Sequence, residues 1–515
     1  MSQSFSSVEK SSRKEVDICL LLEGTYPYVR GGVSSWLHQI ITGLSEFTFH
    51  IIFLGGSPDV YDKPAYEFPP NVLGFEMHFL LSDSGNLKPS ARTGPKEVFE
   101  AWNQFVSFFE QNENPIPSEL LGKISVFLGA EKDLTMQDFL YSEASWDVLT
   151  ERYAESAIRQ SFVDFFWTYR NIYQPLFVLA KISQNLPKAK AFHSVSTGYA
   201  GFLGALCRQQ SKKPYLLTEH GIYTKERKID LAQATWIKDQ HSIMDLSMHK
   251  EIDLTRKTWI SFFEQLGLTA YDQADKIIAL FEGNRERQHI DGADDKKTKV
   301  IVNGISTDRF FKAYDNRPES APMVVGLVGR VVPIKDIKTF IRSIRAALDD
   351  LPDLQGWIIG PNEEDQDYAN ECKQLIESLG LTSHVKMLGS QNVVEMLPQL
   401  GVMILTSISE AQPLVLLEAM AAGIPCVATD VGACREIIEG AAGEDAEIGL
   451  AGEIVPIASP IEAAKSIVRI LQDDKKWASI GDVGKRRVTK YYDDKLMYQA
   501  YRELYREAID GGDRL

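Results

Sequence analysis

Two basic residues follow the apolar run MVVGLV and could bind a diphosphate. Arg330 and Lys335 lie five positions apart in GRVVPIKD, between a predicted strand and a predicted helix. Arginine offers a planar fork of donors and lysine a compact charge, so together they suit phosphate oxygens. A surface ion pair is the alternative for the same two residues. Because loops after strands often carry function, the position favours a phosphate site.

Two glutamates flank the start of a second predicted helix. Glu410 lies in the loop after GVMILTS, Pro413 suits the first helical position, and Glu418 follows about 7 to 8 Å along the helix. The free N–H groups of Leu414 and Val415 would form an anion site. Carboxylates beside an anion make sense if the ligand also carries hydroxyl groups, as ribose and hexose do. The alternative for Glu418 is a solvated helix face, but its neighbours in LVLLEAMAA are apolar, so we expect a specific partner.

Two histidines and one acidic pair are further candidates. His193 follows KAKAF, and His220 follows PYLLTE and precedes a glycine. A histidine near an apolar segment is usually structural, although the glycine after His220 favours a ligand contact. Asp365 and Asp367 have the D-x-D spacing of a metal-dependent sugar-nucleotide site. Acidic residues at the start of a polar helix also complement the helix dipole, so we predict no metal site there.

A pair of glycines follows the first apolar run, in EGTYPYVRGGVSSWL. Gly31 and Gly32 could form a tight turn or let the backbone approach a ligand. The stretch lacks the G-x-G-x-x-G fingerprint of a dinucleotide site. Because it follows the first strand of the first domain, we expect the N–H groups of both glycines to approach a ligand.

Apolar runs and amphipathic segments alternate along the chain and would position these residues. The segment 16–53 reads as a βαβ unit, and an aromatic, helical insertion interrupts the alternation from about 57 to 189. Short apolar runs then resume, and a second series of six strand candidates follows the polar stretch 313–322. The alternation predicts an α/β protein with two doubly wound domains in tandem. The predicted parts are a disordered leader (1–15), an N-terminal Rossmann-like domain with this insertion (16–315), a C-terminal Rossmann-like domain (316–480) and C-terminal helices that pack back on the N-terminal domain (481–515).

Composition narrows the class of protein. The 515 residues carry 55 basic and 71 acidic side chains, a formal charge of −16, so the overall field repels nucleic acids and anionic membranes. No apolar run approaches the roughly 20 residues that span a bilayer, and the first residues lack the apolar core of a secretory signal. Five scattered cysteines without a Cys-x-x-Cys pair argue against a disulfide framework or a zinc site. We expect a cytoplasmic protein.

The motifs GRVVPIKD and SEAQPLVLLEAMAAGIPCVATDVGACREII together resemble the retaining glycosyltransferases of family 4, which have the GT-B fold. LLEGTYPYVRGGVSSWLHQII and TEHGIYTKERKID, with the insertion between them, are similar to the cytosolic glycosyltransferases of Pel exopolysaccharide synthesis. The resemblance implies two Rossmann-like domains that face each other across a cleft. It also implies a UDP-sugar donor, no metal or other cofactor, a growing polysaccharide as acceptor, and membrane-embedded export partners that recruit the protein to the inner membrane.

The resemblance also assigns roles to residues. Arg330 and Lys335 would neutralise the leaving UDP, Glu418 would accept the ribose hydroxyls, and no protein nucleophile is required. The implied catalytic residues are Glu410, His220, Lys335 and Arg330, with Glu410 and His220 on the sugar. The implied donor-binding residues are Gly31, Gly32, Gly329, Arg330, Lys335, Leu414, Val415 and Glu418. Ala411, Gln412 and Pro413 depart from the family pattern, so sugar specificity is not inherited there. Another sugar nucleotide, a lipid acceptor or a catalytically silent scaffold are the alternatives.

Overall fold

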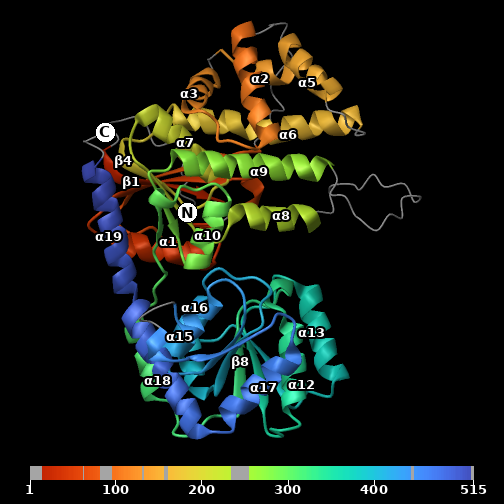
Figure 1. The fold of residues 1–515 in the computed structure, drawn as a ribbon, viewed down its shortest axis with the longest axis vertical. Helices are drawn as coiled ribbons and strands as arrows, with labels where there is room; N and C mark the ends of the chain where they lie inside the picture. The colour runs from red at the N-terminus through yellow and green to blue at the C-terminus, as the bar shows by residue number, and fades with distance from the viewer. Residues whose placement is uncertain are drawn as a thin grey trace, which may run out of the picture. The chain divides into compact units, whose positions relative to one another are not determined.

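The computed structural model describes residues 14–61, 63–81, 95–129, 133–155, 161–233, 254–441 and 446–511 (Figure 1). These residues form two compact units. The first unit comprises the chain up to Ala279, Arg285–Val300 and the residues from Tyr501 on, and the second comprises Leu280–Asn284 and Ile301–Ala500. The leader predicted at 1–15 lies outside the described residues, except for its last two positions.

The strands and helices alternate along both units. The strands are β1 (Val16–Glu23), β2 (Phe49–Gly55), β3 (Val72–Phe79), β4 (Ala189–Ser194), β5 (Tyr215–Glu219), β6 (Lys276–Ala279), β7 (Thr298–Val300), β8 (Val324–Val328), β9 (Gln355–Ile359), β10 (Val385–Gly389), β11 (Val402–Leu405), β12 (Cys426–Thr429) and β13 (Gly452–Val455). The helices up to the second unit are α1 (Gly32–Gly43), α2 (Lys96–Gln111), α3 (Ser118–Phe127), α4 (Met136–Tyr141), α5 (Glu143–Glu155), α6 (Phe162–Ser183), α7 (Tyr199–Ser211), α8 (Tyr223–Gln233), α9 (Leu254–Gln273) and α10 (Glu282–Ile290). The later helices are α11 (Thr307–Asp315), α12 (Ile337–Ala347), α13 (Gln366–Ser378), α14 (Val393–Met396), α15 (Leu414–Ala421), α16 (Cys434–Glu439), α17 (Pro460–Leu471), α18 (Asp474–Tyr491) and α19 (Asp494–Gly511).

The first unit is built on one parallel sheet. Its strand order in the described residues is β3-β2-β1-β4-β5-β6-β7, and every neighbouring pair is parallel. The order reverses between β1 and β4, so the crevice at their carboxyl ends is the place where a doubly wound sheet accepts ligands. The strand β3 was not predicted and falls inside the insertion placed at 57–189. It is an edge strand without a fully buried residue, so its sequence VLGFEMHF contains no apolar run.

The helical insertion packs on the helices that cover this sheet. Helix α7 contacts β1, β4 and β5, while α3 and α6 pack on α7, and α2 packs on α9 (Figure 1). The indole of Trp102 in α2 is buried and donates a hydrogen bond to the Tyr169 hydroxyl of α6 at 2.9 Å. The insertion therefore shares one continuous apolar core with the sheet.

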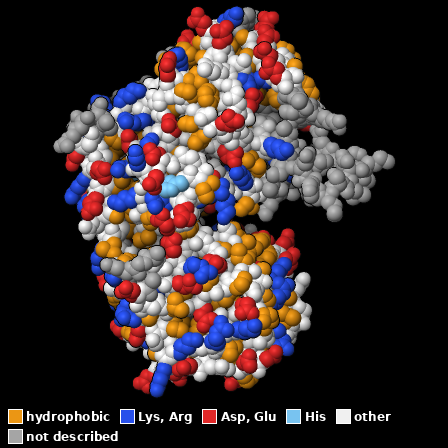
Figure 2. Space-filling view, viewed as in Figure 1, with side chains coloured by type: hydrophobic (Ala, Val, Ile, Leu, Met, Phe, Trp, Pro, Cys, Tyr) orange, Lys and Arg blue, Asp and Glu red, His pale blue; other side chains and the backbone are white. Residues whose placement is uncertain are grey.

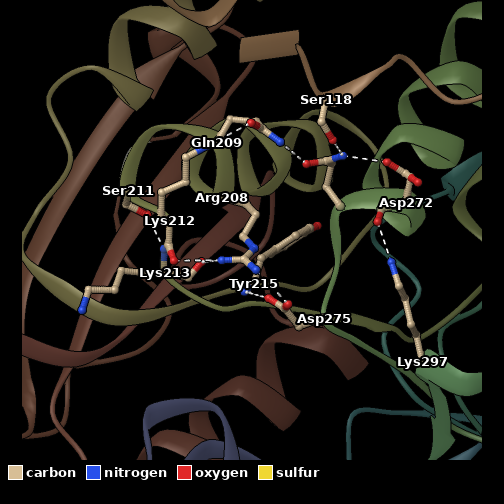
Figure 3. Close-up of polar contacts among 11 residues, drawn as sticks. Ser118, Arg208, Gln209, Ser211, Lys212, Lys213, Tyr215, Asp272, Asp275 and Lys297 are labelled. Atoms are coloured by element: carbon tan, nitrogen blue, oxygen red, sulfur yellow. Dashed lines mark hydrogen bonds and ion pairs between the residues drawn. The ribbon is translucent and has the colours of Figure 1, made fainter. Parts of the chain in front are cut away.

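Polar contacts tie the insertion to the amino-terminal ends of β5 and β6 (Figure 3). The Asp275 carboxylate accepts hydrogen bonds from the backbone of Tyr215 at 2.8 Å and from Arg208 at 3.2 Å. The Gln273 amide of α9 donates to Ser118, the first residue of α3, at 2.9 Å. Because ligands of such sheets bind at the opposite ends of the strands, we assign this network a structural role.

The second unit is a smaller doubly wound sheet. Its order is β10-β9-β8-β11-β12-β13, again parallel throughout, with the reversal between β8 and β11. Successive residues of β11 alternate between two cores: Val402 and Ile404 belong to the core with α12, α13 and α17, and Met403 and Leu405 to the core with α15, α16 and α18 (Figure 1). Burial on both faces explains why these strands read as continuous apolar runs.

The structure divides the chain differently from the predicted boundaries at 316 and 481. Helix α11 belongs to the second unit because Phe310 and Ala313 are buried in its core. Helix α18 also belongs to this unit, since the buried guanidinium of Arg487 donates to the carbonyl of Ile438 at 2.5 Å. Within the predicted C-terminal part, 481–515, the described residues that belong to the first unit begin at Tyr501.

The surface is charged and mixed. Acidic and basic side chains are interspersed over the face of each unit in view (Figure 2). Within the described ranges, no helix combines the length and the apolarity that crossing a bilayer requires.

Candidate active site

The strongest candidate site lies in the second unit at the carboxyl ends of β8 and β11, where the strand order reverses. The loops after these strands are bonded to each other. The Thr406 hydroxyl donates to the carbonyls of Lys335 and Asp336 at 2.9 and 3.0 Å, and the N–H of Ile408 donates to the Ile334 carbonyl at 2.9 Å. The loop that carries Lys335 is therefore held against the loop that leads to Glu410.

Lys335 and Glu410 form a close ion pair. The Lys335 ammonium lies 2.5 Å from Glu410 Oε1, and their side chains are only 19% and 13% exposed. The Ser407 hydroxyl donates to the same carboxylate oxygen at 2.6 Å. The two residues, predicted from separate motifs, are thus brought together, with one lysine and one carboxylate available to a common ligand.

Gly432 fixes the position of the Glu410 segment. Its φ of +53° lies in the left-handed region, and a Cβ atom there would come within 2.3 Å of the carbonyl oxygens of Glu410 and Ala411. The next residue, Ala433, donates from its N–H to the Ala411 carbonyl at 2.8 Å. Only glycine permits this close approach, so Gly432 acts as a positioning residue for Glu410.

Gly329 and Arg330 begin the other loop. The aliphatic part of Lys335 passes over Gly329, where an added Cβ would lie 3.7 Å from Lys335 Cε. Arg330 instead forms an ion pair with Glu364, in which Nη1 donates to both carboxylate oxygens at 2.6 and 2.8 Å, and both side chains are 52% exposed. In this structure, Arg330 therefore forms a surface ion pair, which was the alternative to a phosphate site.

Glu418 has an unusual environment on α15. Its side chain is half-buried, and the carboxylate makes no hydrogen bond or ion pair with the residues that the structure describes. Burial raises the pKa of this carboxyl to about 7, and the charge of Arg309 on α11 offsets the shift only in part. A carboxylate whose charged form is disfavoured and that has no protein donor is open to a ligand that donates hydrogen bonds.

Helix α15 starts one residue later than expected. Pro413 occupies the N-cap rather than the first helical position, and no side chain caps the helix. The N–H groups of Leu414 and Val415 lie in its first turn, which has no intrahelical acceptors. A helix start of this kind attracts anions.

Gln412 is not available to a sugar. Its amide oxygen accepts from the Asn303 N–H at 2.7 Å, its amide nitrogen donates to the Asn303 carbonyl at 3.1 Å, and its side chain is buried. The departure Ala411-Gln412-Pro413 from the family pattern therefore serves a backbone contact within the unit.

In the first unit, His220 lies directly after β5 and packs edge-on against Trp36 of α1, with ring centroids 4.4 Å apart. Burial lowers the pKa of its imidazole to about 4, so the ring is neutral at pH 7. His193, the structural candidate, is fully buried between the hydroxyls of Tyr505 and Thr218, at 2.9 Å from each. Its pKa is lowered to about 3, mainly by burial.

Gly31 and Gly32 form the start of α1. Gly31 is its N-cap with an extended φ of 178°, and a Cβ at either glycine would meet no atom within 4 Å. Neither backbone conformation nor crowding inside the protein requires glycine there. Their approach to a ligand remains a prediction.

Sequence reasoning missed two buried glutamates at the ends of β1 and β5. Glu219 is fully buried and accepts from Thr197, Tyr271 and Gln288 at 3.0, 2.5 and 3.1 Å, and burial raises its pKa to about 7. Glu23 accepts from the Tyr223 hydroxyl at 2.8 Å, and burial raises its pKa as well. An acidic residue that ends an apolar run was the available signal. Their donors come from distant parts of the chain.

The D-x-D pair has a local role. Asp365 caps α13 by accepting from the Tyr368 N–H at 2.9 Å, and Asp367 lies in the first turn. This geometry is the helix-start arrangement predicted for the pair. Among the described residues, no group of three or more His, Cys, Asp or Glu side chains is arranged so that it could hold a metal ion.

Comparisons with known proteins show to which family this chain belongs. Residues 16–296 match the model of a domain of unknown function, DUF3492, and residues 309–487 match the model of glycosyl transferases group 1. An exopolysaccharide phosphotransferase of Streptomyces coelicolor is 34% identical over 187 residues, which are 36% of this chain and 18% of the relative. The matches span 18 to 57% of the length of the first three curated relatives.

Two solved structures resemble the whole chain. Sucrose-phosphate synthase of Thermosynechococcus elongatus has a TM-score of 0.57 at 19% identity and covers 96% of this chain and 100% of its own. HepE of Anabaena, in complex with UDP and glucose, has a TM-score of 0.55 at 18% identity and covers 95% and 99%. The fold, its structural neighbours and the family match assign this chain to the class of GT-B glycosyltransferases, as predicted. Within that class, the chain belongs to the DUF3492 family, joined to a group 1 glycosyltransferase domain.

Proposed function

We propose that the protein is a retaining glycosyltransferase that moves a hexose or N-acetylhexosamine from a UDP-sugar to a growing exopolysaccharide of the Pel type. The observation that carries the proposal is the carboxylate of Glu418, which has a raised pKa and no partner among the described residues, four residues beyond the uncapped start of α15. A sugar nucleotide supplies both complements at once, since its ribose hydroxyls donate and its phosphates are anions. The relative HepE, which was solved with UDP and glucose, supports the choice of uridine.

Catalysis in this proposal is electrostatic. Lys335, paired with Glu410, turns toward the diphosphate and neutralises the charge that develops on the leaving UDP. Glu410, released from part of its ion pair, accepts sugar hydroxyls. Arg330 is exposed and exchanges Glu364 for a phosphate oxygen when the donor binds. These cations and the helix start provide the positive charge, so we propose that no metal is required.

The acceptor attacks from the face that UDP leaves, and a donor phosphate oxygen helps to take its proton. This route needs no protein nucleophile. His220, neutral at pH 7, is suited to a hydrogen bond with a sugar hydroxyl, and Gly31 and Gly32 to backbone contacts with an anion. Membrane-embedded export proteins are the proposed partners.

The proposal is tested by thermal shift with UDP, ADP and GDP. A ligand at 100 times its dissociation constant stabilises the folded state by about 2.7 kcal/mol, so binding should raise the melting temperature measurably. We expect the largest shift with UDP, and the same shift in the presence of EDTA. If none of the three nucleotides raises the melting temperature, the proposed function is wrong. A larger shift with ADP or GDP would transfer the activity to another sugar nucleotide, and loss with EDTA would contradict metal independence.

A further inference from the structure

A cavity of about 570 Å³ opens on the helical insertion, and none of the candidate active-site residues lines it. It is lined by α4, α5 and α6 and the turn between α4 and α5. Its floor is apolar, because Phe139, Leu149 and Tyr169 are each at most 6% exposed. Its volume lies in the range of pockets that bind small molecules, roughly 300 to 1,000 Å³.

Aromatic rings form the rim of the cavity. Trp146 is 50% exposed and Tyr141 36% exposed, which are high values for such large rings. Trp146 packs against Phe166 with ring centroids 6.3 Å apart, so its orientation is supported by α6. Exposed, supported rings offer flat apolar faces to a ligand.

Arg170 is the cation of the cavity. Its guanidinium lies over Phe166 and Tyr141, at 4.4 and 5.6 Å from the ring centroids, and makes no hydrogen bond or ion pair with the described residues. Desolvation lowers its pKa, as expected for a charge taken partly out of water. Its N–H donors therefore lie beside an aromatic rim with no acceptor among the described side chains.

Two further polar groups line the same cavity. The Tyr141 hydroxyl and the carboxylate of Glu143, at the start of α5, belong to exposed side chains and make no hydrogen bond with the described residues. The cavity therefore presents donors and an acceptor together. The nearby serine hydroxyl of Ser145 is already used, since it donates to the Phe139 carbonyl at 2.5 Å.

We propose that this cavity is a saccharide-binding site that holds a segment of the polysaccharide acceptor. Sugar hydroxyls both donate and accept hydrogen bonds, which matches Arg170, Tyr141 and Glu143, and the apolar face of a pyranose ring fits the exposed ring of Trp146. One arginine and one glutamate make the net charge of the lining zero, so the lining has no net electrostatic attraction for a phosphorylated ligand. The choice of a saccharide rests on the proposed function.

A second saccharide site changes how a transferase uses long acceptors. A chain bound at one point has a raised effective concentration at any other site it can reach. The site would therefore favour long acceptors over short ones, through the KM for acceptor. The donor would not be affected.

Direct binding to the full-length protein tests the inference, with maltohexaose, cellohexaose and chitohexaose as probes in isothermal titration calorimetry. We expect at least one hexasaccharide to bind the wild type. Trp146→Ala and Arg170→Gln should each weaken its binding about tenfold, because each loses a stacking face or a charged donor. Trp146→Phe should keep most of the affinity. Trp167→Ala is the matched control, since Trp167 is 54% exposed on α6 but does not line the cavity.

The outcomes separate this inference from the proposed function. If no hexasaccharide binds the wild type, or if Trp146→Ala and Arg170→Gln bind like the wild type, the saccharide site is wrong, even when the UDP shift is normal. If the hexasaccharide binds as expected but no nucleotide raises the melting temperature, the site stands and the transferase proposal fails. A hexasaccharide affinity reduced equally by Trp167→Ala would also contradict the assignment to this cavity.

Discussion

Replacement of Lys335 by alanine is expected to lower kcat/KM for the sugar donor by about 10² to 10³-fold. This is the typical loss when one preorganised group that stabilises transition-state charge is removed. Lys335 is the half of the ion pair with Glu410 that can neutralise a leaving diphosphate, and its exposure of 19% means that water screens it weakly. The measurement is the initial rate of nucleotide release from the donor.

Two companion variants keep this prediction falsifiable. Lys335→Met retains the aliphatic chain that passes over Gly329 and should fold, but should be as slow as the alanine variant. Lys338→Ala removes a lysine three positions further on, which pairs with Glu371 at 2.6 Å on the surface, and should leave the rate unchanged. A wild-type rate in both Lys335 variants would remove this residue from the site.

Replacement of Glu418 by glutamine is expected to weaken UDP binding by about 10 to 150-fold. Hydrogen bonds to charged groups contribute about 1.5 to 3 kcal/mol, and 1.4 kcal/mol is a factor of ten. Isothermal titration calorimetry with UDP measures the loss. Glu462→Gln, at a glutamate of α17 that pairs with Lys465 on the surface, is the control for the same chemical change.

The affinity for UDP should also depend on pH through Glu418. Burial raises the folded-state pKa of this carboxyl from 4.5 to about 7. Between these two pH values, the folded protein without nucleotide keeps a proton on Glu418 that the unfolded chain has lost. The stability that this proton provides is therefore present at low pH and is lost as the pH rises through about 7. A ligand that donates to the carboxylate favours its charged form.

We therefore expect UDP to bind more tightly at about pH 8 than at about pH 6, by more than the titration of UDP itself accounts for. Glu418→Gln provides that reference, because its own side chain does not titrate. The same pH dependence in the wild type and in Glu418→Gln would show that Glu418 does not contact the nucleotide.

The fold was largely predictable because parallel strands buried on both faces are continuous apolar runs. The strands β1, β2, β8, β11 and β12 are buried in this way and were predicted, whereas β3 was not. As an edge strand it has no fully buried residue, so neither of its faces imposes a pattern. The predicted domain boundaries differ from those of the structure because tertiary contacts decide to which unit a helix belongs. One such contact is the hydrogen bond from Arg487 of α18 to the Ile438 carbonyl, which holds α18 in the second unit.

The residues of the candidate site were predictable where a single loop or helix start contains them. Lys335, Glu410 and Glu418 followed from their places after strands and on α15. The partners were not predictable, because they arise from distant segments: Gln412 pairs with the backbone of Asn303, and Arg330 with Glu364. The same is true of Glu219, whose donors Tyr271 and Gln288 lie 52 and 69 residues away.

The most direct test of the central claim is a donor-turnover assay with UDP-glucose, UDP-galactose and the UDP-N-acetylhexosamines, alongside ADP-glucose and GDP-mannose. We predict nucleotide release from at least one UDP-sugar by the wild type, unchanged by EDTA and lost in Lys335→Met. Turnover of ADP-glucose or GDP-mannose alone, or no turnover of any UDP-sugar by protein that binds UDP, would contradict the proposal that this protein is a UDP-sugar-dependent glycosyltransferase.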